Sequence, residues 1–148
     1  MSVLIDNSIT IYEALENIKN GKYVMPAFQR QYVWNMEQIE KLWDSILLDY
    51  PIATFLFWHV DDDNVSWDTY FCNFLSEVSF DSRKQAVSVN YELSNINVKI
   101  TDTAVLDGQQ RLTSLFLSLL GQAYVKQKYA RRTAVGGTVV KLVIELNK

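Results

Sequence analysis

The sequence predicts a single α+β domain, and three observations support this prediction. Apolar residues recur at helical spacing in three segments: 10–20, 35–47 and the stretch after 108. Three other segments are apolar runs of strand length: 52–59, 103–106 and 139–146. The chain has 148 residues, and a chain of that size buries roughly 70% of its unfolded surface as one domain. We therefore expect residues 1–148 to form a small mixed sheet packed against several helices.

The first two helices are expected to begin with capping boxes. In this pattern, a polar cap residue and the side chain three positions later exchange hydrogen bonds with backbone N–H groups. Thr10 and Glu13 fit the pattern at the first helix, and Gly21 is the expected stop. Asn35 and Gln38 fit it at the second. These starts are local signals and do not depend on the rest of the fold.

Apolar stripes predict which helix faces are buried. We expect the second helix to end at Pro51 and to carry a Glu37–Lys41 ion pair on its polar face. Its predicted buried residues are Ile39, Leu42, Trp43, Ile46 and Leu47. Those of the helix after 108 are Leu112, Leu115, Phe116, Leu119 and Leu120.

The strand predictions follow from unbroken apolar runs. Residues 52–59 are expected to form a central strand covered on both faces, 103–106 a short buried strand and 139–146 the last strand. Residues 66–100 have a weaker pattern, which we interpret as a hairpin or meander that decorates the core and carries no chemistry. The acidic cluster at 61–64 lacks the glycine and glutamate of a calcium loop, so a solvated turn is expected there.

Composition excludes several classes of site. The net charge of −3 argues against a surface that binds nucleic acid by charge alone. One cysteine, Cys72, permits no internal disulfide, and Cys72 with His59 makes no zinc site. The N-terminus lacks the features of a signal peptide, and no apolar stretch approaches the ~20 residues of a membrane span, so we expect a cytoplasmic protein.

A local basic run follows the last predicted helix. Its members are Lys126, Lys128, Arg131 and Arg132. The run is interpreted as solvated surface or as the lining of a phosphate-binding groove.

The segment Asp107-Gly108-Gln109-Gln110-Arg111 lies where a buried strand turns directly into a helix. Free backbone N–H groups and the helix dipole attract anions at such a junction, and Arg111 adds a planar fork of donors, so phosphate is the expected ligand. A capping box formed by Asp107 and Gln110, with Gly108 relieving the turn, is the alternative. That alternative leaves Gln109 and Arg111 unexplained.

A second segment, Phe28 to Trp34, also places glutamine beside arginine, at Gln29 and Arg30. Two Gln-Arg pairs suggest one polar cleft, in which guanidinium groups bind phosphate and a carboxylate holds a metal ion or accepts a proton. This set suits nucleotide binding or phosphoester chemistry. Alternatively, Arg30 and Arg111 pair with Asp107, Asp44 or Asp49 in a structural network.

Three segments in this order resemble the N-terminal domain of the GmrSD-type, modification-dependent restriction proteins: MPAFQRQYVW, QIEKLWDSILLDYPI and LDGQQRLTSLF. The resemblance covers residues 8–60 and 100–125. It implies a fold similar to ParB and sulfiredoxin, and nucleoside triphosphate binding and hydrolysis at the DGQQR segment, usually with a divalent metal such as Mg²⁺. The implied role is regulatory, in the restriction of modified phage DNA.

The resemblance also implies a set of site residues. Asp107 would hold the metal or position water, Arg111 and Arg30 would bind phosphates, and Gln110 or Gln29 would orient the attacking water. The predicted catalytic residues are Asp107, Gln110 and Arg111; the predicted nucleotide-binding residues are Gln29, Arg30, Tyr32, Trp34, Gly108 and Gln109. We expect Arg111→Ala to abolish nucleotide binding and to leave thermal stability nearly unchanged.

The chain departs from the full architecture of that family. The nuclease domain with HNH-like histidines is missing and His59 alone cannot replace it, so we expect no DNA cleavage by this chain. We interpret the chain as an N-terminal fragment whose partners are a nuclease domain or subunit and, through the longer protein, DNA. The alternative function is a non-catalytic, DNA-binding or modified-DNA-sensing module, with Tyr32, Trp34 and Trp58 as stacking surfaces. A purely structural interaction domain is a third hypothesis.

Overall fold

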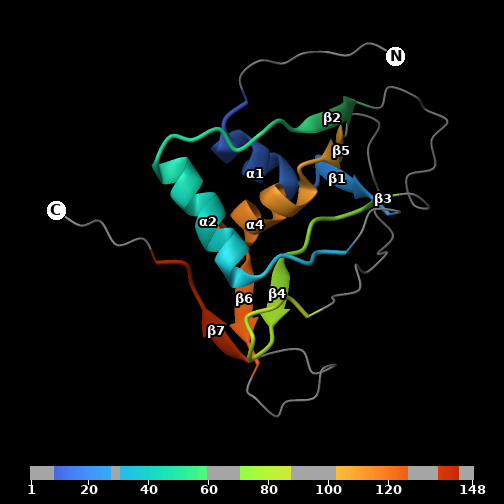
Figure 1. Cartoon of the computed structure of the whole chain (residues 1–148). Helices are drawn as coiled ribbons and strands as arrows, with labels where there is room; N and C mark the ends of the chain where they lie inside the picture. The colour runs from blue at the N-terminus through green and yellow to red at the C-terminus, as the bar shows by residue number, and fades with distance from the viewer. Residues whose placement is uncertain (1–8, 28–30, 60–70, 88–102, 127–136, 144–148) are drawn as a thin grey trace.

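The computed structural model describes residues 9–27, 31–59, 71–87, 103–126 and 137–143, and these form an α+β fold (Figure 1). The predicted fold class is therefore confirmed. The described helices are α1 (Ile11–Lys19), α2 (Met36–Leu47) and α4 (Gln109–Leu119). The described strands are β1 (Tyr23–Pro26), β2 (Leu56–His59), β3 (Phe71–Cys72), β4 (Glu77–Phe80), β5 (Thr103–Asp107), β6 (Gln122–Val125) and β7 (Thr138–Val140).

The strands form two mixed sheets instead of one. The first has the order β2-β5-β1-β3, in which β5 is parallel to β1 and antiparallel to β2. The second has the order β4-β6-β7, in which β6 is parallel to β4 and antiparallel to β7. Because β5 has a neighbour on each side, its first three residues, Thr103 to Val105, are buried, as the sequence predicts.

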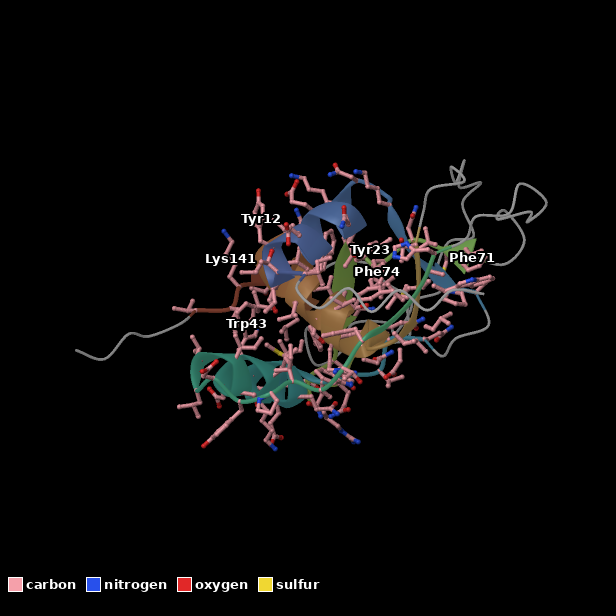
Figure 2. The ribbon with its side chains drawn as sticks, turned by 90° about the horizontal axis from the view of Figure 1, so that it is seen from above. Tyr12, Tyr23, Trp43, Phe71, Phe74 and Lys141 are labelled. Carbon is pink, nitrogen blue, oxygen red and sulfur yellow. The ribbon has the colours of Figure 1, made fainter. Side chains whose placement is uncertain are left out.

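Helix α4 connects the two sheets. It follows β5 of the first sheet, precedes β6 of the second, and occupies the centre of the molecule in Figure 1. Seen from above, it lies between α1 and α2 (Figure 2). Leu112, Leu115 and Phe116 of α4 belong to the main core, together with Tyr23 and Phe74, whereas Leu117 belongs to a second cluster that includes Val78 and Phe80.

Both predicted capping boxes are present. At α1, the Glu13 backbone N–H donates to the Thr10 hydroxyl (3.2 Å) and the Thr10 N–H donates to the Glu13 carboxylate (2.9 Å). At α2, Asn35 and Gln38 make the equivalent exchange at 2.9 and 3.0 Å. Gly21 follows α1 with a positive φ of 70°, as expected of the residue that stops a helix.

The prediction of a central strand over 52–59 is wrong. Only Leu56–His59 is a strand, and it lies at the edge of the first sheet. Ile52 and Phe55 pack against the main core from an irregular segment, in which Ala53 has a left-handed φ of 67°. An apolar run shows that a segment touches the core, but it does not show whether the segment is paired on both sides.

Helix α2 ends at Leu47 rather than at Pro51. Asp49 has a left-handed φ of 58°, which turns the chain before the proline is reached. Leu47 is exposed and not part of a buried stripe, whereas Leu42 is buried and Trp43 packs against the main core. The Glu37–Lys41 pair is present at 2.7 Å.

The second half of the chain requires four further corrections. Leu119 and Leu120 are exposed because α4 ends there. The sequence does not predict the parallel pairing of β4 with β6. Strand β4 carries the buried Val78 and Phe80, so this part of 66–100 belongs to the core. The last strand ends at Val140 within the described residues. Lys126 is only 7% exposed and is not part of a solvated face.

Several predictions concern segments outside the described residues: the turn at 61–64, most of the alternating stretch 87–93, and Lys128, Arg131 and Arg132. Within the described residues, no helix is long and apolar enough to cross a membrane.

Candidate functional site

The junction between β5 and α4 is built around Gly108. The strand runs through Asp107, and α4 begins at Gln109 with Gly108 as N-cap, at a φ of 87°. A Cβ at Gly108 would overlap the ring of Phe55, 2.7 Å from Cε1 and closer still to Cδ1. Among the residues that the structure describes, no side chain caps this helix. The alternative of a capping box between Asp107 and Gln110 is therefore wrong.

A pocket of about 180 Å³ opens beside this junction. It is lined by Trp34, Leu106, Asp107, Gly108, Gln109, Gln110 and Arg111. The first N–H groups of a helix have no partner within the helix, and here no side chain of the described residues caps them. The pocket therefore combines uncapped backbone donors with the carboxylate of Asp107, whose side chain is 70% exposed.

The guanidinium of Arg111 is engaged with the backbone of another segment. It donates to the carbonyls of Ile52 and Thr54, the latter at 2.9 Å, and its Cζ lies 4.6 Å from the centre of the Phe55 ring. The two carbonyls flank Ala53, the residue in left-handed conformation. Arg111 therefore holds the irregular segment that places Phe55 over Gly108, and its side chain is only 16% exposed.

Arg111 also lies near the carboxylate of Asp107, with 3.7 Å between Nη2 and Oδ2. Of the carboxylates proposed as partners for this arginine, Asp107 is the one observed. The pair is long for a salt bridge and Asp107 is mostly exposed, so its contribution to stability is small. The carboxylate of Asp107 thus remains accessible from the pocket.

Gln110 joins the two sequence motifs. Its Oε1 accepts from the Val33 backbone N–H (3.0 Å) and its Nε2 donates to the Gln31 carbonyl (3.2 Å). One turn further along α4, the Ser114 hydroxyl donates to the Gln110 carbonyl (2.7 Å). The Ser114 Oγ is also 2.8 Å from the Tyr32 hydroxyl. Because the one proton of the Ser114 hydroxyl is used for the Gln110 carbonyl, Tyr32 is the donor of this second bond. The segment 31–34 thus lies directly against α4.

The remaining predicted residues differ in accessibility. Gln109 is 7% exposed and its amide donates to the Val105 carbonyl at 2.6 Å, so its side chain ties α4 to β5. Tyr32 is 2% exposed and belongs to the second cluster. Trp34 is half-buried, packs against both clusters and lines the pocket. Gln29 and Arg30 lie outside the described residues.

The described residues offer few side chains that could bind a metal ion or act as a nucleophile. Within the described residues, no group of three or more His, Cys, Asp or Glu side chains could hold a metal ion. Burial raises the pKa of the Cys72 thiol to about 11, so it stays protonated and is a poor nucleophile. His59 lies on β2, with its Nδ1 2.7 Å from the Thr103 hydroxyl, and does not line the pocket. Among the described residues, Asp107 is the carboxylate that lines the pocket.

Sequence reasoning missed two residues that shape this site, Phe55 and Ser114. Phe55 covers Gly108, and Ser114 connects Gln110 to Tyr32. Ser114 lies four positions after Gln110, on the same face of the helix, and that spacing is a signal that was available. No local signal connects Phe55 with Gly108, because the contact joins residues far apart in the chain.

Comparison with known proteins identifies the family. Residues 11–143 match the family described as the GmrSD restriction endonuclease, N-terminal domain. The chain belongs to this family. An uncharacterised protein of Methanocaldococcus jannaschii is similar to this GmrSD N-terminal domain, with 30% identity over 109 residues. The match covers 74% of the chain but only 16% of that protein.

The predicted family resemblance is thereby confirmed, and it extends over both motifs of the pocket. The match at 11–143 includes the segment 31–34, α2 and the β5–α4 junction. The pocket of this GmrSD N-terminal domain is thus formed within the matched region.

Proposed function

We propose that this domain binds a nucleoside triphosphate with Mg²⁺ at the β5–α4 junction and hydrolyses it. We further propose that it does so as the regulatory part of a restriction protein in phage defence, with a nuclease domain or subunit and DNA as partners of the longer protein. Family membership supports the restriction role. The observation that supports the nucleotide site is the uncapped, glycine-started helix that opens into the pocket.

The phosphates are assigned to the first turn of α4. Backbone N–H groups at a helix N-terminus, together with the helix dipole, form a ready-made anion site. Gly108 supplies the left-handed turn that starts the helix, and the ring of Phe55 occupies the space on its Cβ side. The positive charge of Arg111 adds to this field, although two of its donors already bind carbonyls. This arrangement needs no Walker lysine.

Asp107 is assigned to the metal. Mg²⁺ is commonly held by one or two carboxylates together with substrate phosphates, and it would neutralise charge on the phosphate oxygens. An exposed carboxylate beside the phosphate-binding turn fits that donor set. Since the described residues contain no larger cluster of ligands, metal and nucleotide are expected to bind together.

The test is the melting temperature of the chain with ATP, GTP, CTP or UTP, each with and without Mg²⁺. A ligand at 100 times its Kd stabilises a protein by roughly 2.7 kcal/mol, and we expect one nucleotide to raise the melting temperature accordingly. Asp107→Asn should remove the Mg²⁺-dependent part of this shift. Asp44→Asn, on the exposed face of α2 and outside the pocket, is the matched control and should retain it.

The proposal fails if no nucleotide shifts the melting temperature, or if Asp107→Asn responds as the unmodified chain does. Release of inorganic phosphate then tests hydrolysis in the same samples.

The alternative of a DNA-sensing module has less support, because Tyr32 is buried and its hydroxyl is bonded to Ser114, so that it cannot stack on a base.

A further inference from the structure

We propose that Gln110 is a positioning residue of the pocket and not the residue that orients water. Its amide fixes the segment 31–34 and thereby holds Trp34 as the opposite wall of the pocket. The effect on nucleotide binding rests on the proposed function, whereas the effect on Trp34 does not.

The first observation is that both ends of the Gln110 amide are engaged. The oxygen accepts from the Val33 N–H and the nitrogen donates to the Gln31 carbonyl. A backbone donor and acceptor two residues apart are thus held by one side chain, much as a neighbouring strand would hold them. A side chain bound in this way cannot turn toward an attacking water without losing a bond to the segment.

The second observation is that the held segment has no regular structure of its own. Residues 31–35 lie between β1 and α2 and belong to neither a helix nor a strand. The position of this segment therefore depends on contacts with the rest of the fold, and Tyr32 and Trp34 pack in the core clusters. Hydrogen bonds to α4 add to this packing, and they include the two bonds of Gln110 and the bond of Tyr32 to Ser114.

The third observation is that the segment 31–34 places Trp34 in the lining of the pocket. Of the seven described residues that line the pocket, six are consecutive, from Leu106 to Arg111, and Trp34 is the seventh. Trp34 directly follows Val33, whose N–H is bound by Gln110. Gln110 therefore contributes to the width of the pocket between α4 and Trp34.

The direct test observes Trp34 without any nucleotide. The chain labelled with 5-fluorotryptophan carries four tryptophans, and Trp34→Phe assigns the Trp34 resonance by fluorine NMR. Gln110→Met removes both bonds and should move or broaden that resonance. Gln122→Met, at the exposed start of β6, is the matched control and should leave it unchanged. An unmoved Trp34 resonance in Gln110→Met overturns the proposal.

A second variant separates positioning from loss of folding. Gln110→Glu keeps an acceptor for the Val33 N–H but cannot donate to the Gln31 carbonyl. A carboxylate in the first turn also suits the helix dipole, so α4 itself is not weakened. A displaced Trp34 resonance in this variant, with an unchanged melting temperature, would show that the wall moves independently of stability.

Turnover distinguishes the two possible roles of Gln110. If Gln110 positions a binding wall, Gln110→Met raises KM about tenfold, and kcat stays within about twofold, because uniform binding is lost. A fall in kcat with an unchanged KM would overturn the proposal and assign Gln110 to the attacking water. If the unmodified chain binds no nucleotide, the proposed function fails, and the NMR result still decides whether Gln110 holds Trp34.

Discussion

At the scale of single residues, Gly108 is a position where the backbone and a neighbouring side chain both require glycine. Its φ is positive, and a Cβ would overlap the Phe55 ring. Gly21 has a similar φ of 70°, but nothing lies within 4 Å of a Cβ placed there. Substitution of Gly21 therefore measures the cost of the left-handed conformation alone, whereas substitution of Gly108 adds the cost of the clash with Phe55.

We predict that Gly21→Ala lowers the free energy of unfolding by about 1 kcal/mol, the cost of a left-handed L-residue. Gly108→Ala should cost about 2 kcal/mol more, because an aromatic ring must also move. Urea unfolding of both variants measures the difference. Equal decreases in the free energy of unfolding would mean that the Phe55 ring moves aside at no energetic cost. The close packing of Phe55 over the start of α4 would then be wrong.

The contacts of Arg111 change the effect on stability that we expect when this residue is replaced. The sequence predicts that Arg111→Ala leaves stability nearly unchanged, but the guanidinium binds two carbonyls and contacts a ring. We now predict that even Arg111→Lys lowers the free energy of unfolding by about 2 kcal/mol, because a lysine cannot reproduce the fork. Arg83→Lys, on an exposed turn, is the control and should be neutral. If Arg111→Lys left the free energy of unfolding unchanged, the segment 52–55 would not depend on the guanidinium of Arg111.

The sequence could not reveal this role of Arg111. Its partners are backbone carbonyls at 52 and 54, and every residue type has such a carbonyl. The arginine itself signals only a planar donor group. Whether it binds phosphate or carbonyl oxygens depends on which segment the fold brings beside it.

At the scale of elements, helix starts could be predicted and strand neighbours could not. Both capping boxes join residues three positions apart, so the whole interaction is visible in the sequence. The edge position of β2 and the pairing of β4 with β6 depend on segments that are far apart in the chain. The same limit applies to the end of α2, where Asp49 turns the chain before Pro51.

The two boxes differ in their expected response to acid. Hydrogen bonds from the backbone N–H and the hydroxyl of Thr10 lower the pKa of Glu13 below its usual 4.5. A carboxyl group with a lowered pKa in the folded state stabilises the fold at neutral pH, and this contribution is lost as pH falls below 4.5 through the folded-state pKa. The box at α2 uses Gln38, which does not titrate.

We therefore predict that Glu13→Gln makes stability less dependent on pH below about 4.5, because glutamine preserves the box and does not titrate. Thermal unfolding of both proteins between neutral pH and pH about 3 measures this. Gln38→Glu is the reciprocal variant and should introduce acid sensitivity at α2. Identical pH profiles for Glu13→Gln and the unmodified chain would contradict the assigned role of Glu13.

At the scale of the whole molecule, the two sheets are joined through one helix. Helix α4 contributes Leu112, Leu115 and Phe116 to the main core and Leu117 to the second cluster. Trp34 packs against both. The sequence predicted an amphipathic helix with one buried stripe, because a single stripe is what a helix on one sheet needs. The whole run from Leu112 to Leu117 is buried because α4 also contacts α1, α2 and β6 of the second sheet, and the sequence does not predict that sheet.

This shared helix predicts that neither sheet unfolds alone. Leu117 is 4% exposed and contacts the second cluster, so Leu117→Ala should cost about 3 kcal/mol. Because α4 also holds the main core, the loss should lower one common midpoint, with circular dichroism and tryptophan fluorescence changing together. Leu119→Ala, two positions along the same helix and exposed, is the matched control and should change the midpoint little. Two separate transitions in Leu117→Ala would show that the second sheet unfolds independently, and α4 would then not couple the two cores.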